Sequence, residues 1–263
     1  MKTLKVKCPA KINLNLRITG KRKDGFHNIE SIMQTINLFD YLTISVENSL
    51  KNEIILTGNS DQIPYDEHNL IYKASKLFLE IAEIENQKIS INIEKNIPVS
   101  AGLAGGSTDA AGTILGLNKI FNNPLPENKM HEICSKLGSD LNVCLKGGKI
   151  FAKGRGEIIE PMPFEEFNLS LIKPLNLGIS AKEAYTKYSV KKETQTNDFF
   201  ENDLEWAVID DYKELQHIKE KYPKSVMTGS GSTFFIVDNE FEQEKDYWVN
   251  NNLKSINYGV CIA

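Results

Sequence analysis

The sequence contains few cysteines, and the four that it has, Cys8, Cys134, Cys144 and Cys261, are widely spaced. They form no CxxC pair and no spacing typical of zinc ligands, so we expect reduced thiols and no structural metal. No apolar run approaches the roughly 18 residues of a membrane-spanning helix, and residues 1–11 lack the apolar segment of a secretion signal. The formal net charge of −4 gives no basic surface for nucleic acid. We therefore expect a cytoplasmic protein with neither a membrane nor a nucleic-acid partner.

Strand-like and helix-like segments alternate along the 263 residues, which suffice for one large or two ordinary domains. Alternating apolar residues and β-forming composition predict strands at 6–18, 41–47, 54–56, 89–93, 167–173 and 256–262. Helical spacing predicts helices at 69–84, 110–121 and 130–137, from Ser180, over 203–221 and around 240–253. A strand–turn–strand is expected across Thr228–Thr233. This mixture predicts an α+β fold in two domains, residues 1–158 and 159–263.

The most informative segment is Pro98–Gly112, with the sequence PVSAGLAGGSTDAAG. It contains three glycines that permit positive φ and close approach of a ligand to the backbone, Gly102, Gly105 and Gly106. Ser107 and Thr108 then suit the N-cap of a helix, whose free N–H groups and positive dipole end would face the loop. Such an arrangement binds anions, so the segment predicts a phosphate-binding loop.

The loop matches neither of the common nucleotide-binding fingerprints. A Walker A motif needs lysine after its last glycine, but Ser107 follows Gly106, and Ala104 stands where GxGxxG needs a glycine. A strand-to-helix connection without a ligand is the alternative. Asp109 complements the helix dipole, yet it would repel a triphosphate. We therefore expect the positive charge to come from another segment, and Asp109 to face the helix N-terminus or a magnesium-bound water.

Three segments together resemble the GHMP small-molecule kinase superfamily. They are Pro9–Leu14 (PAKINL), Pro98–Thr108 (PVSAGLAGGST) and Met227–Thr233 (MTGSGST). They occur in the order and at the spacing of that superfamily and cover nearly the whole chain. The resemblance implies ATP and Mg²⁺ as cofactors and a site between two domains. The N-terminal domain would be like the second domain of ribosomal protein S5, and the C-terminal domain would be ferredoxin-like.

Further segments narrow the resemblance to one branch of the superfamily. They are Asp24–His27 (DGFH), the stretch Glu30–Asp40, Lys136–Asp140 (KLGSD) and Asn202–Glu205 (NDLE). They look like the branch that phosphorylates the 2-hydroxyl of a cytidine-diphosphate-linked methylerythritol in the non-mevalonate isoprenoid pathway. The resemblance therefore implies this small molecule as the partner of the protein.

The resemblance also implies the catalytic and nucleotide-binding residues. Lys11 and Asp140 match the catalytic pair of the family. The ATP loop matches Pro98, Val99, Ser100, Ala101, Gly102, Leu103, Ala104, Gly105, Gly106, Ser107 and Thr108. An alcohol substrate needs a proton acceptor, for which Asp140 is suited. Lys11 beside it would stabilise the carboxylate and the transferring group, supplying the cation that the loop lacks.

Four residues match positions that contact the cytidylated substrate. Phe26 and Tyr185 match two aromatic rings that lie on either side of the cytosine. His27 matches the position that contacts the edge of the base, and Asn13 matches another position that contacts the substrate. The chain departs from the family at Leu141–Cys144 (LNVC, usually VPFF), at Ser232 (often proline) and at Phe26 (frequently tyrosine). These differences concern substrate affinity and local backbone shape more than reaction type.

Each of these residues also has a simpler interpretation. A lone lysine in a strand usually extends to solvent, an aspartate after Gly-Ser usually caps a turn, and aromatic rings usually pack in a core. Two other functions stay open: another GHMP kinase acting on homoserine or mevalonate, and a catalytically silent nucleotide-binding sensor of the same fold. The Asp24–His27 segment with Tyr185 favours the cytidylated substrate, because a base sandwich has no use for a small acid.

Overall fold

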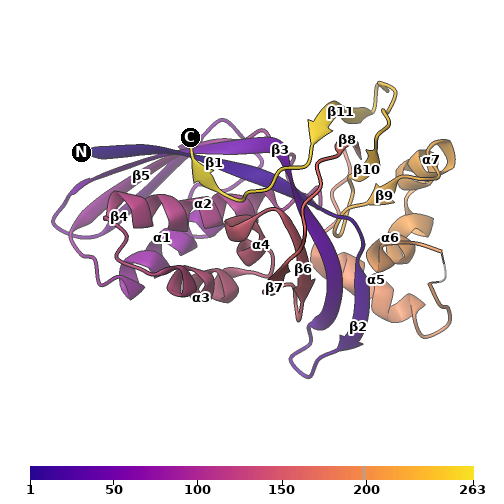
Figure 1. Cartoon of the computed structure of the whole chain (residues 1–263), viewed down its shortest axis with the longest axis horizontal. Helices are drawn as coiled ribbons and strands as arrows, with labels where there is room; N and C mark the ends of the chain where they lie inside the picture. Colours follow the sequence, from indigo (N-terminus) through magenta and orange to yellow (C-terminus); the bar gives the residue numbers. More distant parts are fainter. Residues whose placement is uncertain (198) are drawn as a thin grey trace.

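The computed structural model describes residues 1–197 and 199–263, which form two β-sheets with helices against them (Figure 1). Within these residues the first sheet has eight strands. They are β1 Lys2–Asn13, β2 Arg17–Lys21, β3 His27–Asn48, β4 Glu53–Gly58, β5 Gln87–Glu94, β6 Lys149–Lys153, β7 Ile158–Pro161 and β12 Cys261–Ile262. The central order is β12-β1-β3-β5-β4, while β2 and β6 pair with β3, and β7 pairs with β6.

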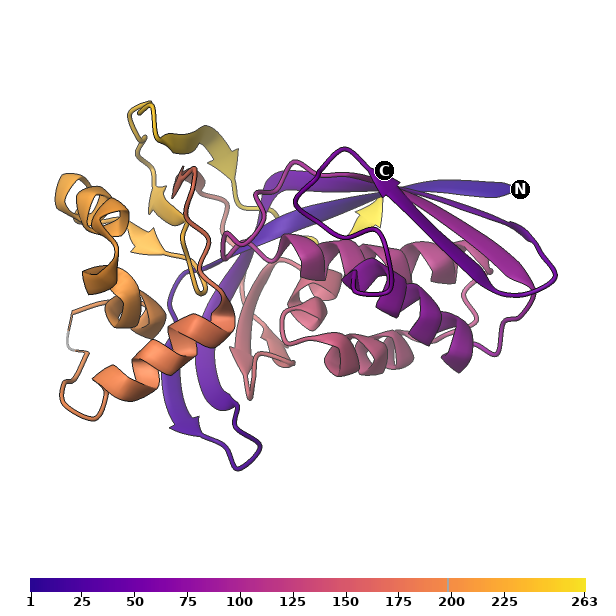
Figure 2. The same ribbon diagram turned by 180° about the vertical axis from the view of Figure 1, so that it is seen from behind.

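Strand β3 runs for 22 residues and joins the two ends of this sheet. It pairs with β2 and then β6 over residues 27–34, with β1 over residues 33–46 and with β5 over residues 41–48. Alternate side chains of β3, such as Leu42, Ile44 and Val46, point into the core. Four helices pack against this face (Figures 1 and 2). They are α1 Leu70–Ile81, α2 Gly105–Ile120, α3 Glu127–Leu137 and α4 Leu141–Lys146.

The second sheet is antiparallel and has the strand order β11-β8-β10-β9. Its strands are β8 Asn168–Pro174, β9 Val226–Met227, β10 Phe234–Val237 and β11 Tyr247–Lys254. The helices of this part are α5 Ala181–Lys191, α6 Asp203–Val208 and α7 Lys213–Lys221, with a 3₁₀ turn at Ile209–Asp211. They share one apolar core with the sheet and with β2, so the β2–β3 end of the first sheet lies between the two parts (Figure 2).

The chain crosses between the two sheets more than once. The predicted boundary after residue 158 falls within β7, which pairs with β6 of the first sheet. Strand β12 then brings the C-terminus back to pair with β1. The junction is tight, because a Cβ at Gly147 would overlap the backbone of Gly259. The division into residues 1–158 and 159–263 therefore stays a prediction, and β12 lies in the first sheet.

The α+β class and most of the predicted elements are confirmed. The helix predicted around 240–253 is wrong, because residues 247–254 form β11, the edge strand of the second sheet. Trp248, expected on a helix, therefore lies on a strand. A β-bulge between Asn250 and Leu253 breaks the alternation by which the strand would be recognised, so pairing with β8 overrides the local pattern. The helical stretch 203–221 divides at Tyr212, whose backbone is extended, and the strand predicted at 256–262 is reduced to Cys261–Ile262.

The four cysteines are unpaired, and burial raises the pKa of the Cys8 thiol. No helix among the described residues is long and apolar enough to cross a membrane.

Candidate active site

Helix α2 begins inside the glycine-rich segment, and its N-cap lies at least three residues earlier than the sequence predicts. Its N-cap is Ala104, in the left-handed conformation with φ 59°, and no side chain caps it. The expectation of a cap at Ser107 or Thr108 is wrong, because both lie in the first turn of the helix. The first helical bond there is from Thr108 N–H to the Ala104 carbonyl. The N–H groups of the three preceding residues are thus left for a ligand.

The loop before α2 is held close to a second glycine-rich segment, Thr228–Thr233. Gly102 has φ 73°, and a Cβ at this position would overlap the carbonyl oxygen of Thr228. No atom outside the immediate neighbourhood of Gly106 would lie within 4 Å of a Cβ there, so the space over the helix N-terminus is open. Backbone N–H groups, a helix dipole and open space together form a site for an anion such as a phosphate.

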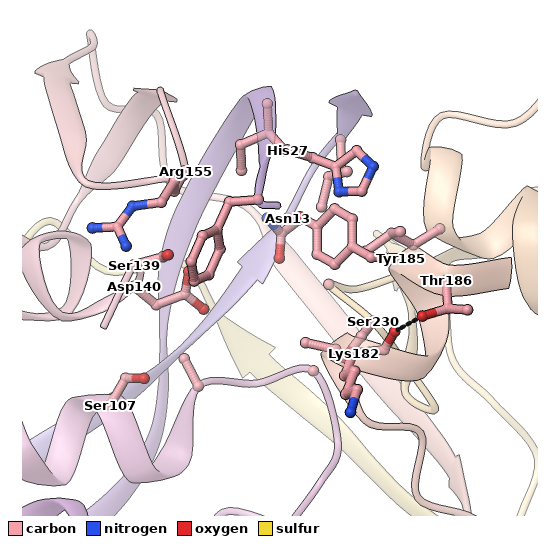
Figure 3. A pocket seen from close by; sticks show the side chains of 18 of the residues that line it. Asn13, His27, Ser107, Ser139, Asp140, Arg155, Lys182, Tyr185, Thr186 and Ser230 are labelled. Atoms are coloured by element: carbon pink, nitrogen blue, oxygen red, sulfur yellow. Dashed lines mark hydrogen bonds between the residues drawn. The ribbon is translucent and has the colours of Figure 1, made fainter. Parts of the chain in front are cut away.

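A cavity of about 780 Å³ lies between the loop, β1, the β2–β3 hairpin and α5. Figure 3 shows Arg155, Ser139, Asp140 and Ser107 on one side of it, and Tyr185, Thr186, Lys182 and Ser230 on the other. The cavity is also lined by all four predicted substrate-contacting residues. The structure therefore brings together the predicted catalytic pair, the N-terminal turn of α2 and the predicted substrate residues.

Lys11 lies at the end of β1 with a side chain that is only 3% exposed. Its Nζ donates to Asn13 Oδ1 at 2.7 Å and to the Gly102 carbonyl at 3.1 Å. It also lies 3.2 Å from Oδ2 of Asp140. The ammonium group does not extend to solvent, as a lone lysine in a strand usually would. It joins the glycine-rich loop to the Asp140 carboxylate instead.

Asp140 occupies the N-cap position of α4, but its side chain makes no capping hydrogen bond. Its carboxylate is 29% exposed and faces the cavity and Lys11. The turn-capping interpretation is therefore wrong. A carboxylate that is open to a cavity and paired with a buried ammonium is placed to accept a proton from a bound alcohol.

An aromatic recess lies at the other side of the cavity. His27 stacks on Tyr185, with ring centroids 5.1 Å apart and an angle of 13° between the planes. Phe26 is 53% exposed, and the Arg155 guanidinium lies 5.1 Å from its ring centroid. Burial, together with Lys21 and Lys192, lowers the pKa of His27, so its ring is neutral at pH 7. Exposed and half-exposed rings beside a neutral imidazole suit a planar, polar heterocycle.

A smaller cavity of about 230 Å³ lies on the other side of the loop. Its walls come from Ile63, Asn69, Ile71, Lys95 and Asp109, together with the loop residues 98–106. Gly102 and Ala104 line both cavities, so the glycine-rich loop is their common wall. A ligand with one end in each cavity would therefore cross the free N–H groups of α2.

The carboxylate of Asp109 is paired with a lysine that follows β5. It is buried, and its Oδ2 accepts a hydrogen bond of 2.8 Å from Lys95 Nζ, which also pairs with Asp40. Asp40 in turn accepts the N–H groups of Asn96 and Ile97 through Oδ1, at 2.6 and 2.8 Å. Burial and the neighbouring Asp40 raise the pKa of Asp109 to about 7, although Lys95 opposes this. The cluster ties the end of β5 to the start of α2, on either side of the loop.

Several residues of the site were missed from the sequence. Lys95, Arg155 and the hydroxyl of Thr228 were not identified as site groups. Lys95 had a signal, because it continues the inward side of β5 after Ile89, Ile91 and Ile93. Thr228 lies in the Met227–Thr233 motif, but the contact that its hydroxyl makes, like the position of Arg155, depends on contacts between distant segments.

Comparison with known proteins agrees with this geometry. Residues 69–148 match the family model described as "GHMP kinases N terminal domain". The chain is 39% identical to the 4-diphosphocytidyl-2-C-methyl-D-erythritol kinase of Clostridium botulinum (strain Eklund 17B / Type B), over 93% of this chain and 94% of that protein. It is similar to a crystal structure of 4-(cytidine 5'-diphospho)-2C-methyl-D-erythritol kinase, with a TM-score of 0.71 and 25% identity over 88% and 89% of the two chains. A crystal structure of mevalonate kinase has the same fold, with a TM-score of 0.71 and 17% identity over 97% and 99%.

The two-sheet α+β fold and the glycine-rich helix N-terminus define a kinase of the GHMP class, which uses ATP. Within that class, the chain belongs to the 4-diphosphocytidyl-2-C-methyl-D-erythritol kinase family.

The Lys95–Asp109 cluster generates a prediction about stability. The raised pKa of Asp109 means that the folded protein binds more protons than the unfolded chain between about pH 4 and pH 7. The free energy of unfolding that comes from protonated Asp109 is therefore fully present below pH 4, and it is lost as the pH rises to about 7. Relative to Asp109→Asn, the free energy of unfolding of the wild type should fall by on the order of 2 kcal/mol from pH 5 to pH 8.

Urea denaturation of both proteins across this range measures the difference, and Asp61→Asn, at an exposed aspartate, serves as the control. If the difference in free energy of unfolding between wild type and Asp109→Asn stays constant from pH 5 to pH 8, the raised pKa of Asp109 is contradicted.

Proposed function

We propose that this chain phosphorylates the 2-hydroxyl of 4-diphosphocytidyl-2-C-methyl-D-erythritol, using ATP with Mg²⁺, in the cytoplasm and as a step of the non-mevalonate isoprenoid pathway. One observation carries the proposal. The Lys11–Asp140 pair lies in a cavity between the open N-terminal turn of α2 and a recess lined by Phe26, His27 and Tyr185. A phosphate donor and a base-bearing acceptor can therefore meet at the same carboxylate.

The charges around the cavity support an acceptor that carries a diphosphate. Lys21, Arg155 and Lys182 line it in addition to Lys11. Cations at several points around one cavity suit a ligand with charge along its length. Homoserine and mevalonate offer neither a base for the aromatic recess nor a diphosphate for these cations, although a mevalonate kinase has the same fold.

The nucleotide fits the second cavity and the loop. Its base and sugar would occupy the small cavity beside Asn69, and its phosphates would lie over the N–H groups of Gly105, Gly106 and Ser107. Among the described residues, the one cluster of three or more metal-ligating side chains is the exposed Asp66, Glu67 and His68. Mg²⁺ would therefore be held mainly by phosphate oxygens and water, and it would neutralise charge on the phosphates.

The residues present support a direct transfer. Asp140 accepts the proton of the substrate hydroxyl, whose oxygen forms the new bond to the γ-phosphorus while the bond to the β-phosphate oxygen breaks. Lys11 keeps Asp140 in place and offers positive charge to the transferring group. Asn13 fixes the Lys11 ammonium through its side-chain oxygen. His27, neutral and stacked on Tyr185, can exchange hydrogen bonds with the edge of a base.

The direct test is an assay of ADP release with ATP and Mg²⁺ and one acceptor at a time. The cytidylated methylerythritol should give sustained turnover, while homoserine and mevalonate should give none above the background without acceptor. ADP release with homoserine or mevalonate alone would overturn the proposed substrate and leave the kinase class standing.

The catalytic pair gives the second prediction from this site. Asp140→Asn removes the proton acceptor, and Lys11→Met removes the cation but keeps a similar length of side chain. Each should lower kcat by at least about 100-fold, within the range expected for loss of a general base or of a preorganised charge. Circular dichroism establishes that the variants are folded. Near-normal kcat in either folded variant would rule out its assigned role.

The aromatic recess gives a prediction about binding. Tyr185→Ala should raise KM for the cytidylated substrate roughly tenfold or more and leave KM for ATP within about threefold, because base stacking is worth about 1–3 kcal/mol. Tyr185→Phe keeps the ring and is the matched variant, with an expected KM near that of the wild type. An equal rise in both KM values for Tyr185→Ala would place Tyr185 outside the acceptor site.

A further inference from the structure

The buried segment Asn202–Glu205 has no part in the chemistry described above, although it was one of the recognisable motifs of the sequence. Asn202 and Glu205 are fully buried. Asn202 Nδ2 donates to the carbonyls of Met227 and Gly229 at 2.6 and 2.9 Å. Glu205 Oε2 accepts the Met227 N–H at 2.9 Å. These hydrogen bonds hold the backbone on both sides of Thr228.

Thr228 contacts the catalytic segment of the other half of the chain. Its hydroxyl is buried, accepts the backbone N–H of Asn13 at 3.0 Å and donates to the carbonyl of Gly102 at 3.2 Å. Asn13 and Gly102 are also the two residues whose oxygens accept hydrogen bonds from Lys11 Nζ. One hydroxyl thus contacts both residues that orient the catalytic ammonium.

The same motif also holds the start of β2 and the residue before it. Asp203 Oδ2 accepts the N–H of Ile18 at 2.6 Å. The backbone N–H of Leu16 donates to the carbonyl of Glu201, and the Leu16 carbonyl accepts the N–H of Asp203. The connection from β1 to β2 is therefore held by the same buried segment that holds the backbone around Thr228. A contact chain runs from Asn202 through Thr228 to Asn13 and Gly102, and from these to Lys11.

We propose that Thr228, held in place by Asn202, is a positioning residue for Lys11 in phosphoryl transfer. The inference rests on the proposed function. Thr228 does not itself touch Lys11: it fixes the Asn13 backbone and the Gly102 carbonyl, and these set the direction of the ammonium toward Asp140. Displacing a catalytic group by about 1 Å can cost on the order of 100-fold in rate, so loss of this hydroxyl is expected to appear in kcat.

The test compares three variants. Thr228→Val keeps the shape and removes the hydroxyl, and Thr228→Ser restores it. Thr233→Val is the matched control, because Thr233 lies on the same loop, is buried, and has a hydroxyl without a hydrogen-bond partner among the described residues. Thr228→Val should lower kcat by roughly 10- to 100-fold, with KM for each substrate within about threefold. Thr228→Ser should recover most of the loss, and Thr233→Val should keep the wild-type kcat.

A second measurement does not depend on turnover. In protein labelled with ¹⁵N at lysine Nζ, a ¹H–¹⁵N spectrum reports buried, hydrogen-bonded ammonium groups, and Lys11→Met identifies the Lys11 signal. The signal should shift or be lost in Thr228→Val and stay in place in Thr228→Ser and Thr233→Val. Asn202→Asp places a carboxylate against two carbonyls, so the Lys11 signal should also shift or be lost in this variant.

The outcomes separate the two proposals. A wild type without turnover on the cytidylated substrate would overturn the proposed function, and the Lys11 signal would still decide the positioning. Equal kcat values and equal Lys11 signals for folded Thr228→Val and Thr233→Val would overturn the role of Thr228. A fall in kcat together with an unmoved Lys11 signal would also overturn it.

Discussion

The ammonium group of Lys11 lies within reach of three oxygens from three separate segments: Asn13 of β1, Gly102 of the loop and Asp140 at the start of α4. A cation that is almost fully buried is costly unless its donors are satisfied, and removing one partner leaves an uncompensated charge. The three segments must therefore converge for the fold to tolerate Lys11. Burial of this one group fixes the glycine-rich loop, Asp140 and the end of β1 in relation to one another.

The sequence predicted the parts of this arrangement that depend on local pattern. The alternation of Ile89, Ile91 and Ile93 predicted β5, and the glycine-rich stretch that follows predicted a helix N-terminus suited to anions. The pairing of Lys11 with Asp140 was implied by the resemblance to the GHMP kinases and not by local pattern, and the structure places the two groups 3.2 Å apart. The inward direction of the Asp40 and Lys95 side chains could also have been predicted, because each residue continues the buried side of an alternating strand.

Other features depend on contacts that no local pattern encodes. Thr228 and Asn13 are 215 positions apart and meet only because the second sheet lies against the β2–β3 end of the first. The edge strand β11 has polar residues at its bulge, so its strand character comes from pairing with β8. The start of α2 at Ala104 was missed for a related reason: Ser107 and Thr108 are good N-cap residues, but the packing of Gly102 against Thr228 sets where the chain turns.

The charges explain why a loop without a lysine can serve a nucleotide. Lys95, next to the loop in sequence, is taken up by Asp40 and Asp109 and has little charge to offer a phosphate. The charge of Lys11 is opposed by Asp140. The charges of Lys11 and Lys95 next to the loop are therefore largely cancelled, and the loop contributes dipoles and N–H groups instead of a full charge. Such a site does not bind the donor through one strong ion pair. Under the proposed function the remaining positive charge would come from Mg²⁺ with the nucleotide and from Lys21, Arg155 and Lys182, which line the larger cavity.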